Sequence, residues 1–286
     1  HGAAIMTATT VIVKVASFLY KMPLGSMALL GDEGYAHFLV AYNIYSFFLT
    51  LATAGFPVAL SRMISAADTL DRPGQVQRIF TTASGVMAAI GGTFTLIMLV
   101  FNRRLAAMMG DTDAALSIVA LAPAVILVCM TATYRGYCQG RSNMIPTAYG
   151  QVIEEVGKLI VGLALAWLLI RAGKGLPMAS AGAILGVTAS CLVSSFYLFG
   201  CFRKSYKFLP VTDEPVTGYK DTAKGLLIIA IPITIGSAGL QILTMLETKI
   251  YMGQLLGLGY SQLDADSMKG IYNMSQTIHN MPMAFI

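Results

Sequence analysis

Residues 35–61 read YAHFLVAYNIYSFFLTLATAGFPVALS, an uncharged apolar stretch. A helix that crosses a membrane needs about 20 mostly apolar residues, so this stretch is long enough. Similar stretches fill most of the chain, and a further one begins near residue 270. The predicted spans are residues 3–22, 35–61, 79–100, 114–134, 146–170, 178–201 and 225–250. The sequence therefore predicts an all-α fold, a polytopic transmembrane helical bundle.

The composition supports this fold class. Of 286 residues, 56% are hydrophobic and 12% are charged. Soluble domains carry roughly 25% charged residues, so the chain has too little polar surface for a water-soluble globule. A soluble enzyme, a nucleic-acid-binding module and a disordered chain are therefore excluded. The four cysteines are widely spaced, and we expect reduced thiols.

Basic residues in the predicted loops indicate the orientation, because cytoplasmic loops carry an excess of Lys and Arg. With a cytoplasmic N-terminus, the inner side holds ten and the outer side seven. The inner residues are Arg62, Arg72, Arg78, Arg135, Arg141, Arg203, Lys204, Lys207, Lys220 and Lys224. The outer residues are Lys21, Arg103, Arg104, Arg171, Lys174, Lys249 and Lys269. This asymmetry favours a cytoplasmic N-terminus.

Two short sequence matches suggest an internal repeat. Residues 29–35 read LLGDEGY and residues 255–260 read LLGLGY, an offset of 226. Residues 56–60 read FPVAL and residues 281–285 read MPMAF, an offset of 225. Each offset spans six predicted helices, an even number, so both copies would face the same way. We expect two parallel lobes related by an axis along the membrane normal.

The repeat defines the expected domains. Residues 1–201 would form an N-terminal six-helix lobe, and residues 202–224 a basic cytoplasmic linker. Residues 225–286 would begin a second lobe with its helix 7 and a truncated helix 8. Because the sequence starts at His1 and stops inside an apolar run, we expect a fragment that lacks its C-terminal part.

Polar residues recur every three or four positions in three spans, which places them on one helix face. They are Thr7, Thr10, Lys14, Ser17 and Lys21; Asn43, Ser46, Thr50 and Thr53; and Thr234, Ser237, Gln241, Thr244 and Thr248. The eighth span continues the pattern with Asn273, Gln276 and Asn280. Polar groups are costly in hydrocarbon, so these stripes predict a wet cavity between the lobes. The alternative is ordinary helix–helix packing.

Lys14 is the most informative charge in this pattern. It lies near the middle of the first span, where a charge costs about 2.5–3.5 kcal/mol on insertion scales. A water-filled or anion-holding site would explain it, and a long-range ion pair with Glu247 is the alternative. Lys21, near the end of the same span, is interpreted more simply as an interfacial anchor.

The fifth span carries charged residues on one face. Glu154 and Lys158 stand four apart in the favourable order, which predicts a structural ion pair near the cytoplasmic end. The alternative is that Glu154 couples transport to a proton or cation, with Glu247 as a second candidate. His37 is interpreted as isolated. The sequence contains no metal-ligand cluster and no catalytic motif such as HExxH or GxSxG.

Three runs carry a family resemblance: GFPVALSRMIS (55–65), YRGYCQGRSNMIPTAYGQVIEE (134–155) and IYNMSQTIHNMP (271–282). They resemble the stage V sporulation protein B and polysaccharide-biosynthesis branch of the multidrug/oligosaccharidyl-lipid/polysaccharide exporter superfamily. MurJ-like lipid II flippases are related to this branch. The resemblance implies a MATE-like fold of two six-helix lobes, with helices 1, 2, 7 and 8 around a central cavity.

The resemblance also implies a function. It indicates a flippase of the bacterial plasma membrane that moves an undecaprenyl-diphosphate-linked oligosaccharide or peptidoglycan precursor by alternating access. Lys14 matches a basic position of helix 1 in these relatives, whereas Phe48 and Leu49 replace their basic pair in helix 2. Gln276 and Thr277 stand near the basic position of helix 8. The expected cavity residues are Lys14, Ser17, Lys21, Asn43, Ser46, Thr50, Gln241, Thr244, Asn273, Gln276 and Asn280.

The expected partners are a lipid-linked sugar and membrane lipids, with no nucleic acid and a monomeric full-length protein. We expect no enzyme activity, no metal and no cofactor, with coupling to Na⁺, H⁺ or the membrane potential. One alternative is a cation-coupled multidrug exporter of the same superfamily, which would need an intramembrane carboxylate in the first lobe. Another is a membrane scaffold without a central cavity.

Overall fold

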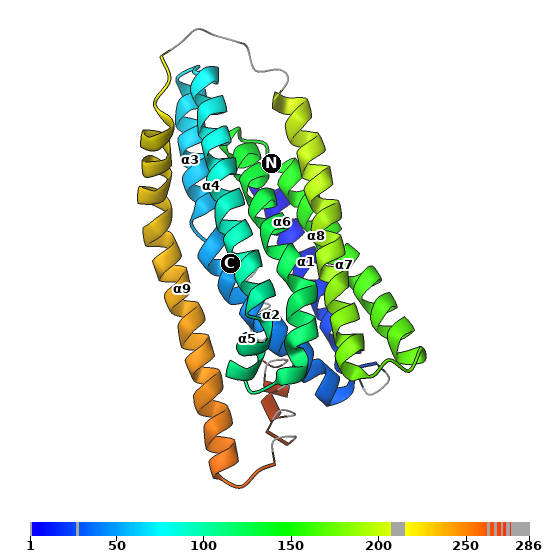
Figure 1. Cartoon of the computed structure of the whole chain (residues 1–286). Coiled ribbons are helices and arrows are strands. Elements are labelled where there is room, and N and C mark those ends of the chain that lie inside the picture. Colours follow the sequence, from blue (N-terminus) through cyan, green and yellow to red (C-terminus); the bar gives the residue numbers. More distant parts are fainter. Residues whose placement is uncertain are drawn as a thin grey trace.

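The chain forms a bundle of long helices, shown in Figure 1 as a computed structural model. The structure describes residues 2–26, 29–206 and 215–261, and the short pieces 264–265, 268–269, 271–272 and 275. Within these residues there is no β-strand, which confirms the predicted all-α class.

The helices follow the predicted spans closely. They are α1 (Gly2–Leu24), α2 (Gly31–Thr53), α3 (Phe56–Thr69), α4 (Pro73–Val100), α5 (Asn102–Met108), the 3₁₀ helix η1 (Thr112–Ala114), α6 (Ala115–Gly140), α7 (Ile145–Arg171), α8 (Leu176–Tyr206) and α9 (Tyr219–Gly257). By length and composition, 6 candidate membrane spans occur among the described residues. Helix α7 is not one of them, and it carries three charged residues along its first half. Most of the eighth predicted span, and the repeat copy at 281–285, lie outside the described residues.

The predicted span over residues 35–61 lies within a single candidate membrane span, Gly34–Thr69, which is interrupted after Thr53, where Gly55 and Pro57 permit a bend. Helix α2 stops at Thr53, and α3 starts at Phe56 and continues to Thr69. Pro57 occupies the first turn of α3, where its missing N–H costs nothing. A Cβ at Gly55 would collide with the backbone oxygen of Ala230 in α9. Glycine therefore permits α9 to approach the break between α2 and α3.

Small residues bring α7 and α8 together in the most extensive helix–helix contact of the lobe. A Cβ on Gly186 in α8 would overlap the backbone of Gly162 in α7. A Cβ on Gly157 would lie 2.8 Å from the Cβ of Ser190. In membranes, where burial of apolar surface from water is not available, such close backbone contact is a main source of helix association.

Aromatic rings fill the end of the lobe where α4, α6 and α8 meet. The rings of Phe80 and Phe202 stack with their centroids 4.1 Å apart, and Tyr137 packs edge-on against Phe80 at 5.4 Å. Tyr137 is fully buried. This cluster fixes the ends of three long helices against one another.

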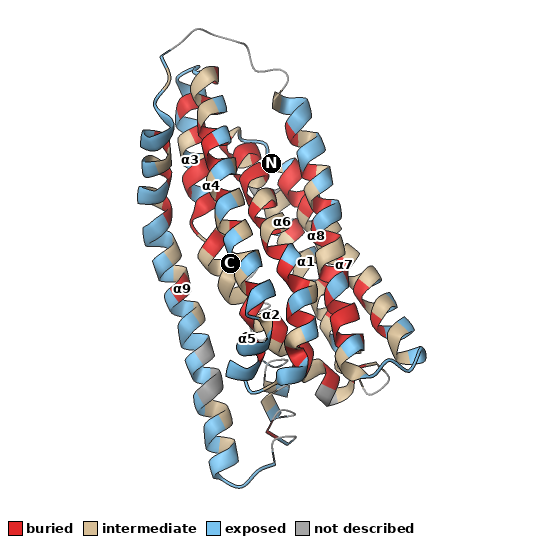
Figure 2. Ribbon diagram, in the orientation of Figure 1, coloured by how far each residue is buried: buried red, intermediate tan, exposed pale blue. Residues whose placement is uncertain are grey.

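The first half of helix α9 packs against the lobe. At its base, the side chain of Gln75 donates to the Thr217 hydroxyl at 2.7 Å and accepts from the Thr217 N–H at 2.9 Å. Arg78 lies over the ring of Tyr219, 3.9 Å from its centroid. The second half of α9 extends beyond the bundle and is mostly exposed (Figure 2). Its outward face is apolar, as a helix in lipid requires.

Candidate functional site

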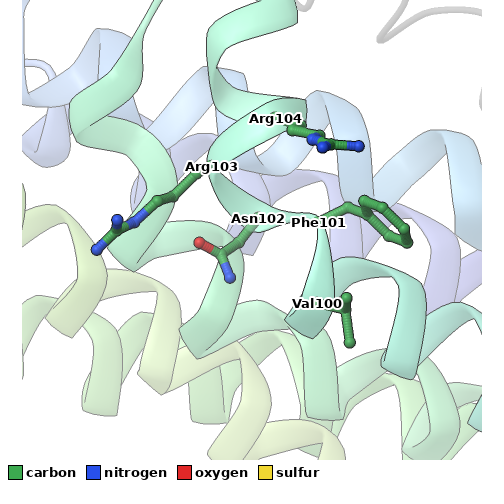
Figure 3. Close-up of a pocket in the computed structure, with 5 residues that line it drawn as sticks. All are labelled: Val100, Phe101, Asn102, Arg103 and Arg104. Carbon is green, nitrogen blue, oxygen red and sulfur yellow. The ribbon is translucent and has the colours of Figure 1, made fainter.

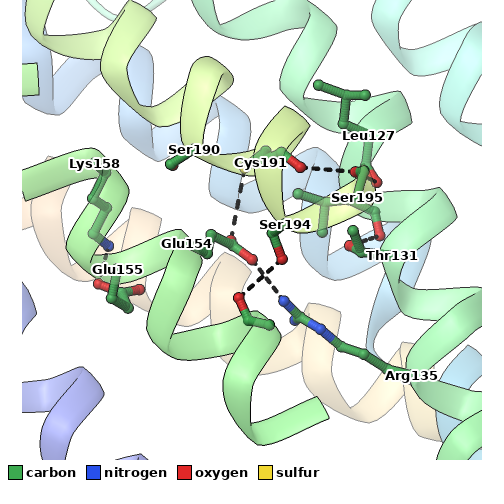
Figure 4. Close-up of polar contacts among 12 residues, drawn as sticks. Leu127, Thr131, Arg135, Glu154, Glu155, Lys158, Ser190, Cys191, Ser194 and Ser195 are labelled. Carbon is green, nitrogen blue, oxygen red and sulfur yellow. Dashed lines mark hydrogen bonds and ion pairs between the residues drawn. The ribbon is translucent and has the colours of Figure 1, made fainter. Parts of the chain in front are cut away.

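Two carboxylates of α7 organise the polar interior of the lobe. Glu154 Oε2 accepts a hydrogen bond from Arg135 of α6 at 2.6 Å, and the two side chains are only 20% and 17% exposed. Cys191 of α8 donates its S–H to Glu154 Oε1 at 3.7 Å. Figure 4 shows Arg135 and Cys191 approaching Glu154 from two different helices. Glu154 thus joins α6, α7 and α8.

Glu155 makes a second set of contacts on the side of α1. Its Oε2 accepts from the Ser17 hydroxyl at 2.7 Å and pairs with Lys158 Nζ at 2.5 Å. Lys158 is buried, and its Nζ lies 5.9 Å from the centre of the Tyr20 ring. The Tyr20 hydroxyl donates to the backbone oxygen of Ala183 in α8 at 3.0 Å. Ser17 and Tyr20 therefore tie α1 to α7 and α8.

The four charges of this network balance, since Arg135 and Lys158 neutralise Glu154 and Glu155. A buried charge without a partner is far more costly than a paired one. The network consequently stabilises the arrangement of α1, α6, α7 and α8, and each carboxylate already has a cationic partner within the lobe.

This geometry corrects two predictions. The Glu154–Lys158 pair does not form. Glu154 pairs instead with Arg135 of α6, and Lys158 pairs with Glu155, three positions before it on α7. Both spacings bring side chains together on a helix, so the tertiary partner decides between them. Arg135 itself is predicted in an inner loop, but it lies inside α6.

His37 is the second position where sequence reasoning misses a contact. From the sequence alone, His37 is interpreted as isolated. In the structure His37 is buried in α2, and its Nδ1 lies 2.5 Å from Asp111 Oδ2. Asp111 also accepts from the N–H groups of Asp113 and Ala114, at 3.1 and 3.3 Å, and so caps η1. His37 and Asp111 are 74 positions apart, so the local sequence gives no sign of their contact. The sequence around Asp111 indicates only that this residue caps a helix.

The stripe on α1 faces two environments. Ser17 contacts Glu155, while Lys14 and Lys21 are half-buried on a helix that packs mainly against α7. Thr10 donates to its own backbone, at the oxygen of Met6, 2.9 Å away. Part of the stripe therefore serves contacts within the lobe, and the two lysines stay as predicted cavity residues.

The stripes on α2 and α9 lie on neighbouring helices. Asn43, Ser46 and Thr50 are half-buried on α2, which packs against α6, α8 and α9. Gln241 is half-buried on α9, whereas Thr244 is exposed and donates to the backbone oxygen of Leu240 at 3.0 Å. The structure thus pairs α2 with α9 and α1 with α7.

A hollow of about 170 Å³ lies where α9 crosses α2 and α4. Its lining is almost wholly apolar, with Thr234 of the α9 stripe as the polar exception; it consists of Leu51, Ala52, Phe56, Ile90, Leu227, Ala230, Ile231, Thr234 and Ile235. This hollow therefore suits acyl chains or packing side chains more than a charged group.

Several predicted site residues lie elsewhere. Glu247 is exposed on the extended part of α9, where its Oε1 accepts from the Tyr272 hydroxyl at 2.7 Å. Asn273, Gln276 and Asn280 fall outside the described residues. In the part of the chain that the structure describes, no three His, Cys, Asp or Glu residues gather as metal ligands would.

Comparison with known proteins gives consistent relatives. The family model described as polysaccharide biosynthesis protein matches residues 1–286. Among Bacillus subtilis (strain 168) proteins, the chain is 28% identical to the uncharacterized membrane protein YabM over 288 residues, covering 100% of this chain and 53% of that one. It is 26% identical to stage V sporulation protein B, covering 98% and 54%. It is 23% identical to lipid II flippase MurJ, covering 94% and 52%. The chain thus spans about half the length of these curated relatives.

Solved structures show the same fold at lower identity. A crystal structure of MATE in the straight conformation matches with a TM-score of 0.74 and 15% identity, covering 98% of this chain and 60% of that one. A MOP superfamily transporter from Pyrococcus furiosus matches with a TM-score of 0.71 and 16% identity, covering 99% and 62%. The likeness confirms the predicted MATE-like fold.

Proposed function

The chain belongs to the polysaccharide biosynthesis protein family, and from this premise we propose that it is part of a transporter that moves a lipid-linked sugar across the bacterial plasma membrane. The membership confirms the resemblance noted from its motifs. The chain is a multi-pass membrane protein, as its long apolar helices indicate. The proposed substrate is an undecaprenyl-diphosphate-linked oligosaccharide or peptidoglycan precursor, carried by alternating access without any chemical step.

Lys14 is the single observation that carries this proposal. It lies about midway along α1 and is half-buried rather than extended into solvent. A lysine at membrane depth is costly unless it serves a partner or a wet site. A diphosphate entering a low-dielectric cavity would be neutralised there more strongly than in water.

The cavity would be lined by the polar stripes. Their placement on adjacent helices α2 and α9 supports this for Ser46, Thr50 and Gln241. The proposed set also includes Lys14, Ser17, Lys21, Asn43, Thr244, Asn273, Gln276 and Asn280. A monomeric full-length protein with two lobes would complete this cavity.

The proposed energy source is Na⁺, H⁺ or the membrane potential. Glu154 and Glu247 are the carboxylates to examine, and they differ in their surroundings. Glu154 is already paired with Arg135, whereas Glu247 is exposed and accepts from Tyr272. A cation that used Glu154 would have to compete with a guanidinium 2.6 Å away.

A cation-coupled drug exporter is the second candidate, because the solved structures of this fold include MATE transporters. Both candidates place the N-terminus in the cytoplasm. The basic residues predicted on the inner side, ten against seven on the outer side, support this orientation.

Replacing Lys14 with alanine is expected to abolish transport. We expect the variant to fail to complement a strain that lacks its lipid-linked sugar flippase, because the diphosphate loses its counter-charge. Lys14→Arg should retain activity, since it keeps the charge. Lys174→Ala, on an exposed turn, is the matched control.

Membrane levels of all three variants are measured in parallel, which separates transport from folding. Full complementation by Lys14→Ala at normal abundance would remove Lys14 from the mechanism. Equal failure of Lys14→Arg would show that charge is not the property required.

The cavity itself is tested by labelling single cysteines with a membrane-impermeant maleimide. In a background whose four native cysteines are alanine, Ser46→Cys and Gln241→Cys are expected to react, because water would reach them. Leu240→Cys, on the exposed apolar side of α9, should stay unlabelled in lipid. If Ser46→Cys and Gln241→Cys are as unreactive as Leu240→Cys, the stripes serve packing.

A further inference from the structure

A hollow of about 430 Å³ opens at the turn between α4 and α5, away from the stripes. It is lined by five consecutive residues, Val100, Phe101, Asn102, Arg103 and Arg104, drawn in Figure 3. Two adjacent exposed arginines are therefore part of one surface depression. Neither arginine belongs to the proposed transport site, so a role for this pair does not depend on the transport function.

Neither Arg103 nor Arg104 takes part in the ion pairs with acidic side chains that the described residues form. Asp111, the nearest acidic residue in sequence, is occupied by His37 and by two backbone N–H groups of η1. Asp113 is exposed and also takes part in none of those ion pairs. The junction consequently presents two uncompensated positive charges.

The position of the junction matches the boundary of a membrane. Helix α4 has 28 residues, which at 1.5 Å per residue is more than the roughly 30 Å hydrocarbon core requires. Apolar side chains around its end are exposed, with Val100 63% and Met108 82% accessible. Ala106 of α5 is fully buried against the lobe. Arginines beside exposed apolar residues at a helix end are typical of the headgroup region.

The geometry distinguishes a lipid surface from a single bound ion. Figure 3 shows Arg103 and Arg104 reaching to opposite sides of Asn102, so that they flank the hollow instead of meeting at one point. The Asn102 amide is engaged, since it donates to the backbone oxygen of Leu99 at 2.5 Å. Arg104 also lies 5.8 Å from the centre of the Phe101 ring. Two diverging guanidinium groups suit neighbouring phosphates in one plane.

We propose that Arg103 and Arg104 at the α4–α5 junction bind the phosphate groups of anionic phospholipids and so anchor this end of the lobe at the membrane surface. The exposed Val100 and Met108 would lie against the first carbons of the acyl chains. The hollow between the arginines would receive a headgroup.

The test measures lipid binding to the purified protein in a neutral detergent by native mass spectrometry. Dioleoyl-phosphatidylglycerol and dioleoyl-phosphatidylcholine share their acyl chains and differ in headgroup charge. The variant Arg103→Ala/Arg104→Ala is expected to bind phosphatidylglycerol about twenty-fivefold more weakly, from about fivefold for each basic residue near anionic lipid. Binding of phosphatidylcholine should be unchanged.

The matched control is Arg203→Ala/Lys204→Ala, an equally exposed basic pair at the end of α8 on the opposite end of the bundle (Figure 1). An equal loss of phosphatidylglycerol binding in this control would overturn the proposal, because net charge alone would then explain the effect. Unchanged binding in Arg103→Ala/Arg104→Ala would also overturn it. The proposal would also be overturned if inorganic phosphate bound the wild-type protein as strongly as phosphatidylglycerol, because that would indicate a site for a free ion. Circular dichroism of each variant verifies that helical content is retained.

Discussion

Replacing Arg135 with leucine is expected to lower the free energy of unfolding by about 3–5 kcal/mol. The change leaves the carboxylate of Glu154, only 20% exposed, without its cation inside the lobe. Cys191 would remain as a hydrogen-bond donor, but a thiol cannot supply a compensating charge. The effect is measured by unfolding the purified protein in mixed micelles with a rising fraction of SDS.

Two further variants make this result specific. Arg141→Leu breaks the looser pair with Asp68, whose atoms are 3.4 Å apart and whose side chains are 31% and 37% exposed. An exposed pair contributes less than about 1 kcal/mol, so this control should be mild. The double variant Arg135→Leu/Glu154→Leu should recover much of the stability, because both charges are gone. An Arg135→Leu variant no less stable than Arg141→Leu would contradict the structural role of the pair.

Replacing Gly186 with leucine is expected to separate α7 from α8. Even a Cβ at this position would overlap the Gly162 backbone, and backbone atoms cannot rotate aside as a flexible side chain can. Because close contact drives helix association in lipid, we expect a loss of about 3 kcal/mol or more, beyond ordinary overpacking. The same SDS titration measures it.

Gly200 provides the matched control on the same helix, since a Cβ there would meet nothing within 4 Å. Gly200→Leu should therefore leave stability and expression close to those of the wild-type protein. If Gly186→Leu and Gly200→Leu unfold at the same SDS fraction, the α7–α8 crossing is not as close as the structure describes.

The spans could be predicted from the sequence because length and hydropathy are local properties. The break after Thr53 could not, although Gly55 and Pro57 are visible in the sequence. Proline in a membrane helix is compatible with a kink, a break or a helix start. The structure shows an interruption at the place where the backbone of Ala230 in α9 leaves no room for a Cβ at Gly55.

The interior charges show a similar limit. Helical spacing offers Lys158 two partners, Glu154 and Glu155, at equally accessible positions. Arg135 decides between them from another helix. His37 is likewise paired by a residue from a distant connection. Local patterns identify which residues are costly in a membrane, but the tertiary fold determines what compensates them.

The polar stripes are detectable by their spacing, yet spacing does not say what each stripe faces. Ser17 donates to Glu155 within the lobe, whereas Gln241 lies seven residues after Thr234, the polar residue of the hollow beside α2 and α4. Both satisfy the same periodicity. The predicted four-helix cavity therefore stays a prediction, to be decided by labelling.

The pairing of Arg135 with Glu154 also bears on how the chain enters the bilayer during synthesis. Helix α6 emerges from the ribosome first and carries Arg135, a charge that is costly in a membrane helix without a partner. Only residues 141–144 separate α6 from α7, so the compensating carboxylate follows 19 positions later in the next helix. The α6–α7 hairpin, and not either helix by itself, is the smallest unit that the translocon can release with its charges matched.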